Sequence, residues 1–230
     1  MPQLQAVVFD LDGTLIDSAP DITVAINRLL DRYGRPHISV AQVRGMVGDG
    51  APVLLRRVFA ASGAPLDPEE APEIYATFLD FYESQSASPD SIFPGVLETL
   101  DILLARGLLL GLCTNKPERV TIEVLDQLDL ARFFRAVAGG DTLPVRKPDG
   151  GHVSWVVERL GAAPGTAVMV GDNHNDVAAA RGAGIPVIAC SYGYPHVPVA
   201  EMGADAIIDH FSDLPAVLDT IKLRSAPLGG

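Results

Sequence analysis

The sequence predicts an α/β fold in which a parallel sheet forms the core and a group of helices is inserted into it. Short apolar runs without polar alternation recur along the 230 residues, which is typical of parallel strands covered on both faces. Helical patterns with a period of 3.6 residues lie between most of these runs, as expected for βαβ units. From about residue 18 to residue 88, the chain has helical patterns only.

Six apolar runs are expected to be the strands of the sheet. They are Ala6–Phe9, Leu108–Cys113, Ala136–Ala138, Ala167–Val170, Val187–Cys190 and the weaker Ala206–Ile208. Each run has about the length of a strand. Their alternation with helical patterns predicts a doubly wound, Rossmann-like sheet.

Prolines and glycines mark the expected helices between the strands. Apolar residues follow the helical period after Pro94 and after Pro117, and again from Val153 to Leu160. Gly107 and Gly161 stand where the first and last of these helices would end. Proline is favoured at the start of a helix and glycine just past its end, so these positions support the assignment.

Three helices are expected in the inserted segment. Apolar residues line one helical face from Ile22 to Tyr33, from Val53 to Phe59 and from Ile74 to Tyr82. Helices with one apolar face bury that face against each other. The insert is therefore predicted to be a helical unit with a core of its own.

The expected domain boundaries follow from this insert. We assign residues 1–16 and 90–230 to an α/β core domain and residues 17–89 to an all-helical cap domain. Linkers near Asp17–Pro20 and Ser86–Pro94 would join the two, and an insert held on two linkers is suited to act as a lid. The tail from residue 224 to residue 230 is expected to be flexible and is assigned no role.

Composition excludes several classes of partner. The chain has 17 basic and 29 acidic residues, a net charge of −12, and no basic stripe that could replace counterions on a nucleic acid. It also has no polybasic membrane anchor, no signal peptide and no apolar run long enough to span a bilayer. Cys113 and Cys190 lie in apolar runs and are expected to be buried and reduced. We expect a cytoplasmic monomer or homodimer without nucleic-acid or membrane partners.

Polar residues that follow the apolar runs are the candidates for a functional site, because open α/β sheets bind ligands at the carboxyl ends of their strands. These residues are Asp10 and Asp12 after the first run, Thr114, Asn115 and Lys116 after the second, Arg146 and Lys147 beyond the third, and Asp172 and Asp176 after the fourth. Several carboxylates, a hydroxyl and a lysine are thus expected in one crevice.

The four carboxylates of Asp10, Asp12, Asp172 and Asp176 indicate a metal site. Acids brought together in one crevice repel one another unless a cation lies among them. Oxygen ligands alone favour a hard ion, and Mg²⁺ above Ca²⁺. The alternative for Asp172 and Asp176 is a role in capping the helix that follows them. For the four acids together we favour the metal site.

Two superficial motif matches fail. An EF-hand loop starting at Asp10 would need Gly at its sixth position and Glu at its twelfth, where Leu15 and Asp21 stand. The order Gly48-Asp49-Gly50 is not a dinucleotide-binding fingerprint, because Val53 takes the place of the third glycine. No Walker A sequence is present.

Lys147 and Thr114 together suggest an anion clamp. Alone, a lysine among carboxylates can be a surface counter-charge, and a threonine after a strand can cap the next helix. Together they offer a positive charge and a hydrogen-bond donor to the same anion.

The motifs resemble those of the haloacid-dehalogenase superfamily. The segment Asp10-Leu11-Asp12-Gly13-Thr14-Leu15-Ile16-Asp17-Ser18 resembles the first motif of this family. The pairs Thr114-Asn115 and Lys147-Pro148 and the segment from Gly171-Asp172 to Asp176 resemble the second, third and fourth motifs, in that order. The resemblance covers essentially the whole chain. Within the superfamily, the segment from Val43 to Ala51 and the segment Tyr192-Gly193-Tyr194 are similar to bacterial phosphoglycolate phosphatases.

The resemblance implies a role for each motif residue. Asp10 would be the nucleophile that forms an aspartyl-phosphate and a ligand of Mg²⁺. Asp12 would protonate the leaving alkoxide, then deprotonate the hydrolytic water, and its backbone carbonyl would bind Mg²⁺. The remaining roles are phosphoryl binding by Thr114, Asn115 and Lys147, direct Mg²⁺ binding by Asp172 and support of the metal by Asp176, directly or through water.

Substrate choice would fall to the cap. The candidates are Arg44, Gly48, Asp49 and Gly50. Glycine allows a close approach of the backbone, and Arg44 could meet a second anion, although the glycines can also simply form a turn. Two histidines have no assigned role: His174 is expected to face solvent, and His152 stands where relatives often have proline.

The expected function is Mg²⁺-dependent hydrolysis of a small phosphomonoester, with 2-phosphoglycolate as the first choice. The alternatives on the same scaffold are phosphatases for sugar phosphates, N-acetylmuramate 6-phosphate, pyrophosphate or a nucleotide, and a phosphoglucomutase-type phosphotransferase. The resemblance disfavours halide chemistry, because dehalogenases lack the second acid that Asp12 supplies. A non-catalytic module that binds phosphate or a partner is a further alternative, which the Asp10–Asp12 pair and Lys147 argue against.

Overall fold

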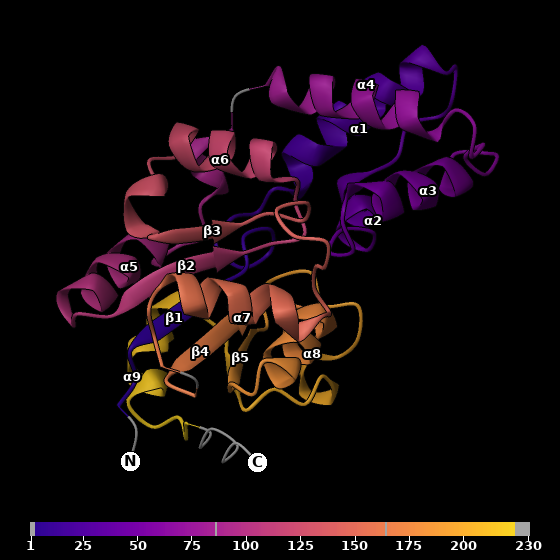
Figure 1. Cartoon of the computed structure of the whole chain (residues 1–230). Helices are drawn as coiled ribbons and strands as arrows, with labels where there is room; N and C mark the ends of the chain where they lie inside the picture. The colour runs from indigo at the N-terminus through magenta and orange to yellow at the C-terminus, as the bar shows by residue number, and fades with distance from the viewer. Residues whose placement is uncertain (1–2, 86, 164, 224–230) are drawn as a thin grey trace.

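The computed structural model describes residues 3–85, 87–163 and 165–223. Within these ranges the chain forms one parallel sheet with helices on both faces (Figure 1). The strands are β1 (Ala6–Phe9), β2 (Leu109–Cys113), β3 (Ala136–Ala138), β4 (Ala167–Gly171), β5 (Val187–Cys190) and β6 (Ala206–Ile208). The tail 224–230 and Ser86, the first residue of the second expected linker, lie outside the described residues.

The strands lie in the order β3-β2-β1-β4-β5-β6, and each neighbouring pair is parallel. This is the doubly wound topology that the sequence predicts. The chain winds from β1 to β3 toward one edge and from β4 to β6 toward the other. The switch point therefore lies between β1 and β4, and a crevice for ligands is expected there.

Nine α-helices are described. They are α1 (Ala19–Arg32), α2 (Val40–Arg44), α3 (Ala51–Ala61), α4 (Ala71–Glu83), α5 (Val96–Ala105), α6 (Glu118–Gln127), α7 (Gly150–Arg159), α8 (His174–Gly182) and α9 (Leu214–Leu218). Short 3₁₀ turns occupy Pro89–Ser91, Ala131–Phe133, Val199–Glu201 and Phe211–Asp213. No described helix is long and apolar enough to cross a membrane.

The sheet separates two apolar cores. Along β1, Val7 and Phe9 point into the core that α5 and α9 also line, whereas Ala6 and Val8 point into the core that α7 and α8 line. All four side chains are fully buried. Burial on both faces explains why the strand is a continuous apolar run without polar alternation.

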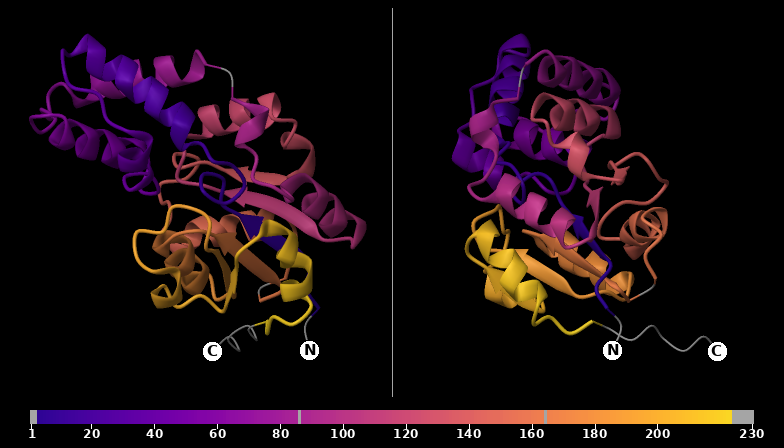
Figure 2. Two further views of the ribbon diagram at one scale, coloured as in Figure 1. Left: turned by 180° about the vertical axis from the view of Figure 1, so that it is seen from behind. Right: turned by 90° about the vertical axis from the view of Figure 1, so that its left-hand side faces the viewer.

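Helices α1 to α4, which follow β1 and precede α5 in the chain, lie beyond one end of the sheet (Figures 1 and 2). Buried residues from three of these helices, among them Leu29, Phe59 and Phe78, form the centre of this layer. The expected helix periods are thus confirmed for α1, α3 and α4. The short helix α2 was not expected. It begins at a capping box, in which the Ser39 hydroxyl accepts from the Gln42 N–H and the Gln42 side chain accepts from the Ser39 N–H.

Candidate active site

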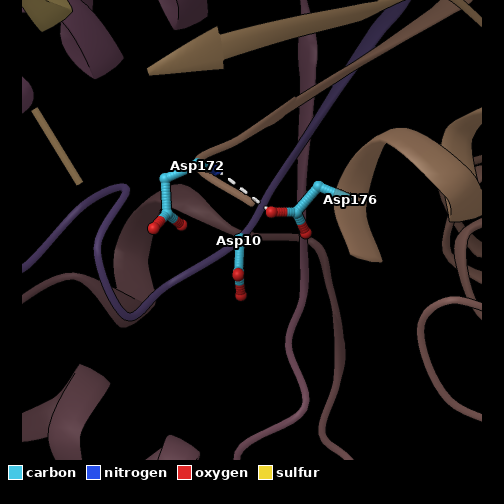
Figure 3. Close-up of side chains that lie close together, drawn as sticks. All are labelled: Asp10, Asp172 and Asp176. Atoms are coloured by element: carbon cyan, nitrogen blue, oxygen red, sulfur yellow. Dashed lines mark hydrogen bonds between the residues drawn. The ribbon is translucent and has the colours of Figure 1, made fainter. Parts of the chain in front are cut away.

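Three buried carboxylates lie together at the switch point of the sheet. Asp10 follows β1, Asp172 follows β4, and Asp176 lies in the first turn of α8 (Figure 3). One carboxylate oxygen of each lies within 4.8 Å of the others. Residues more than 160 positions apart therefore meet because β1 and β4 are neighbours in the sheet.

Asp176 caps a helix and also lies in the acidic cluster. Its Oδ2 accepts hydrogen bonds from the backbone N–H groups of Asp172 at 3.0 Å and Asn173 at 3.1 Å. Asn173 is the N-cap of α8, so Asp176 completes a capping box. Its other oxygen lies 2.6 Å from the ammonium of Lys147. The capping of α8 thus holds Asp176 in the acidic cluster.

Lys147 lies between two of the carboxylates. Its Nζ is 2.9 Å from Asp10 Oδ1 and 2.6 Å from Asp176 Oδ1, and its side chain is 1% exposed. Burial opposes the charged form of a lysine, but the two carboxylates outweigh it and raise the pKa of Lys147. The lysine is therefore charged, and the cluster of three acids and one lysine has an excess of negative charge.

The pKa values of two of the acids are raised in these surroundings. Burial, with the neighbouring carboxylates, raises the pKa of Asp10 to about 6 and raises the pKa of Asp172 well above its usual value. A cation among these oxygens would lower both pKa values again. The donor set consists of oxygens only, which fits a hard divalent cation. The residues present therefore fit a metal ion.

Asp172 is held by the segment Tyr192-Gly193-Tyr194 and by the loop after β1. Its Oδ1 accepts from the Thr14 hydroxyl at 3.0 Å, and its Oδ2 accepts from the Tyr194 N–H at 2.7 Å. A Cβ on Gly193 would collide with the Asp172 side chain and with the Gly13 carbonyl oxygen. The Tyr194 hydroxyl also donates to Asp17, in the first expected linker. This segment, noted in the sequence only for its resemblance, thus orients a candidate metal ligand.

Asp12 does not join the three clustered carboxylates through its side chain. Its two oxygens lie 3.1 Å and 3.3 Å from Nζ of Lys116. Lys116 also donates to the Tyr82 hydroxyl of α4 at 2.8 Å. The sequence placed Lys116 at the right strand end but gave it no role, and Tyr82 was noted only as a core residue of its helix. The signal that could have pointed to Lys116 is its position two residues after Thr114 of the second motif.

Asn115 lies at the site, but its side chain has a different task from phosphate binding. Its Nδ2 donates to the carbonyl oxygens of Gly48 and Lys147, both at 2.9 Å. Both amide hydrogens of the side chain are therefore used within the protein. Thr114 is 1% exposed, and its Oγ accepts from the Lys116 N–H at 3.3 Å.

A pocket opens beside Asp10 and Asp12 toward the inserted helices. Its volume is about 530 Å³ including its open mouth, within the usual range for small-molecule sites. Thr114, Asn115 and Lys116 line it from the core, and the inserted segment supplies Ile22, Val47, Gly48, Gly50, Ala51, Leu54, Phe78, Leu79 and Tyr82. The pocket is thus mostly apolar on the helical side and polar where β1 and β2 end.

The candidate specificity residues divide into two pairs. Gly48 and Gly50 line the pocket, with φ angles of 122° and 87° that favour glycine. Arg44 and Asp49 do not line it. Arg44 is ion-paired with Asp17 at 2.6 Å, and Asp49 accepts from Asn175 at 2.7 Å. Arg44 is therefore engaged by Asp17, outside the lining of this pocket.

The two unassigned histidines have different surroundings. His174 is exposed, as expected. His152 is fully buried in α7, where its Nδ1 accepts the N–H of Lys147 at 3.2 Å and its Nε2 lies 3.0 Å from the Gly139 carbonyl oxygen. This pattern places the single ring proton on Nε2. Burial, with the charge of Lys147, lowers the pKa of His152 to about 4, so the ring is neutral at pH 7.

We expect His152→Phe to lower kcat about 10-fold, because the ring no longer ties the Lys147 backbone to the loop after β3. His152→Gln, which can donate and accept a hydrogen bond, should retain more activity than His152→Phe.

The pKa of His152 also makes the stability of the fold depend on pH. The unfolded chain binds a proton on His152 below pH 6.5, and the folded chain does not until about pH 4, so the free energy of unfolding falls as the pH falls through this window. Urea unfolding of wild type and His152→Phe across the window measures this cost. Equal kinetics and parallel pH profiles would contradict the role.

The fold and the site define the class of this protein. The family model of the haloacid dehalogenase-like hydrolases matches residues 4–184, and the chain belongs to this family of hydrolases.

Several proteins that are similar to this chain are named phosphoglycolate phosphatases. The phosphoglycolate phosphatase of Caulobacter vibrioides is 45% identical over 221 residues, which cover 96% of this chain and 93% of that protein. Phosphoglycolate phosphatase 1 of Pseudomonas aeruginosa is 42% identical over 217 residues, covering 93% and 79% of the two chains. The crystal structure of a predicted phosphoglycolate phosphatase from Haemophilus somnus 129PT superposes with a TM-score of 0.86 at 32% identity, covering 94% and 99%.

Proposed function

We propose that this chain hydrolyses 2-phosphoglycolate to glycolate and inorganic phosphate, with Mg²⁺ as its cofactor and an aspartyl-phosphate on Asp10 as the intermediate. The observation that carries the proposal is the arrangement at the carboxyl ends of β1 and β4. The buried Asp10 carboxylate lies beside the ammonium of Lys147, and Asp10 and the partly buried Asp12 both line the pocket. The names of the relatives support phosphoglycolate as the substrate.

Asp10 is the nucleophile in the first step. Its Oδ1 is held by the Leu11 N–H at 2.7 Å and by Lys147 at 2.9 Å, so the carboxylate has a fixed orientation. An Asp10 oxygen bonds to phosphorus while the bond from phosphorus to the glycolate oxygen breaks. Asp12 gives a proton to this leaving oxygen, because an alkoxide leaves poorly without one. Lys147 stabilises the negative charge on the phosphoryl oxygens.

Water completes the reaction in the second step. Asp12, now a carboxylate, takes a proton from the water as its oxygen attacks phosphorus. The bond between Asp10 and phosphorus breaks, inorganic phosphate leaves, and the Asp10 carboxylate is restored. The two displacements replace one difficult hydrolysis, and the same two acids serve in both.

Asp10, Asp172 and the backbone carbonyl of Asp12 would hold Mg²⁺, and Asp176 would support it. When bound, Mg²⁺ neutralises the excess charge of the acids and stabilises charge on the phosphoryl group. Asp176 fits a supporting role, since its oxygens already accept from two backbone N–H groups and from Lys147.

The helical segment acts as a cap in this proposal. Residues 17–89 would form the cap domain, and residues 1–16 and 90–230 the core domain. The apolar side chains that the helices bring to the pocket would exclude bulk water during turnover, and a pocket of about 530 Å³ suits small phosphorylated compounds. The free, buried cysteines support a reducing, cytoplasmic compartment, where we propose that the chain acts as a monomer or homodimer without nucleic acid.

Phosphate release from a panel of phosphomonoesters tests the proposed function. The panel contains phosphoglycolate, sugar phosphates, N-acetylmuramate 6-phosphate, pyrophosphate and nucleotides. We expect phosphoglycolate to lead in kcat/KM. EDTA should abolish release and added Mg²⁺ restore it, because the acids repel one another without a cation. A different leading substrate would contradict the substrate assignment, and full activity in EDTA would contradict the metal site.

A further inference from the structure

A buried lysine at the boundary of the cap and the core has no part in the steps above. Lys116 follows β2, and its side chain is 4% exposed. Lys116 is the only lysine or arginine among the described residues that line the pocket. Its ammonium is held between the Asp12 carboxylate and the Tyr82 hydroxyl, at the wall of the pocket.

The ammonium of Lys116 contacts two side chains in the described chain, Asp12 and Tyr82. A lysine ammonium has three N–H donors. In the described chain, one is directed at the Asp12 carboxylate, 3.1 Å and 3.3 Å from its two oxygens, and one at the Tyr82 hydroxyl at 2.8 Å. When a single donor serves the carboxylate, the third donor can turn to a ligand in the pocket.

The position of Asp12 fixes what part of a substrate would meet this donor. Asp12 must lie against the leaving oxygen, because it exchanges a proton with it. In phosphoglycolate, the carboxylate carbon is attached to the carbon that bears this oxygen. A group so close to the leaving oxygen lies next to the Asp12 carboxylate and within reach of the ammonium that is bonded to it.

We propose that Lys116, positioned by Asp12 and Tyr82, is the specificity-determining residue that binds the carboxylate of the substrate. The inference rests on the proposed function and extends it from one compound to a class. The site takes phosphomonoesters that have an anionic group one carbon away from the ester oxygen. Val47, Leu54 and Phe78 line the same pocket. Their apolar side chains would exclude water and so strengthen the ion pair between Lys116 and the substrate carboxylate.

A pair of substrates that differ only in this charge tests the proposal. Phosphoglycolate and its amide have the same length and shape, but the amide is uncharged at the end that would meet Lys116. We expect the wild type to prefer phosphoglycolate about 10- to 100-fold in kcat/KM, the effect of one charge-assisted hydrogen bond. In Lys116→Met the two kcat/KM values should become nearly equal, and Lys116→Arg should restore part of the preference.

Tyr82→Phe and a distant variant provide the controls. Tyr82→Phe removes the hydroxyl that orients Lys116 and should reduce the preference about 2- to 5-fold. It keeps the proposal testable if Lys116→Met does not fold, which a thermal unfolding curve checks. Arg119→Met removes one positive charge from the first turn of α6. The Arg119 side chain is 71% exposed and pairs with Glu83, outside the pocket. The substitution should leave the preference unchanged.

The outcomes separate this inference from the proposed function. An equal loss for both substrates in Lys116→Met, with the preference intact, would show that Lys116 acts only through Asp12 and would overturn the inference. A wild type that does not prefer phosphoglycolate over its amide would overturn the inference and the substrate assignment together. A preference that disappears in Lys116→Met but persists in Arg119→Met supports both.

Discussion

Asp10→Asn is expected to reduce kcat by roughly 10⁴-fold or more, because the amide cannot attack phosphorus and no intermediate forms. The substitution keeps the shape of the side chain. Steady-state phosphate release with saturating Mg²⁺ and phosphoglycolate measures the loss. Residual activity within 10-fold of wild type would exclude Asp10 as the nucleophile.

The same variant should not be less stable than the wild type in EDTA. Burial raises the pKa of Asp10 to about 6, above its usual value of 3.8, so the folded chain holds a proton that the unfolded chain has lost. Between these pH values the ionisation of Asp10 lowers the free energy of unfolding as the pH rises, and at pH 7 the full cost is present. Asparagine has no such cost. Urea unfolding in EDTA at pH 7 therefore separates loss of chemistry from loss of fold.

Lys147→Met is expected to reduce kcat/KM by about 10²- to 10³-fold, since it removes the positive charge that faces the phosphoryl oxygens. It should also lower the free energy of unfolding by about 3–5 kcal/mol, because Asp10 and Asp176 lose their buried partner. The loss of activity and the loss of stability both come from removing one buried ammonium, in a side chain that is 1% exposed. Kinetic assays and urea unfolding curves in EDTA measure them separately.

Lys222→Met is the matched control for this prediction. Lys222 is exposed and lies after α9, outside the pocket. Its substitution removes the same charge from the protein and should change kcat/KM and the free energy of unfolding little. Similar effects of the two substitutions would show that net charge, and not the position of Lys147, is responsible.

The sheet was predictable because the same physical constraint acts on every strand. Strands buried on both faces must be apolar throughout, so runs such as Ala6–Phe9 and Val187–Cys190 have the bounds of β1 and β5. The polar residues at the strand ends were predictable for a related reason, since parallel strands present their carboxyl ends at one edge. This is why Asp10 and Asp172 could be expected to meet although 162 positions separate them.

Local patterns did not predict features that depend on a partner from elsewhere in the chain. Helix α2 has five residues, too few to show a period. Lys116 gains its place from Asp12 and from Tyr82 on α4, and no spacing in the sequence indicates that meeting. Arg44 was a candidate for anion binding, but its ion pair with Asp17 depends on the path of the chain between them.

The central claim is that Asp10 is phosphorylated during turnover. Acid quenching during steady-state hydrolysis of phosphoglycolate, followed by mass spectrometry of proteolytic fragments, tests it most directly. We predict a phosphoryl group on the fragment that contains Asp10, absent from the Asp10→Asn variant. Steady turnover without any phosphorylated fragment, together with inversion of configuration at a chiral phosphorus, would show a single direct displacement by water and contradict the account.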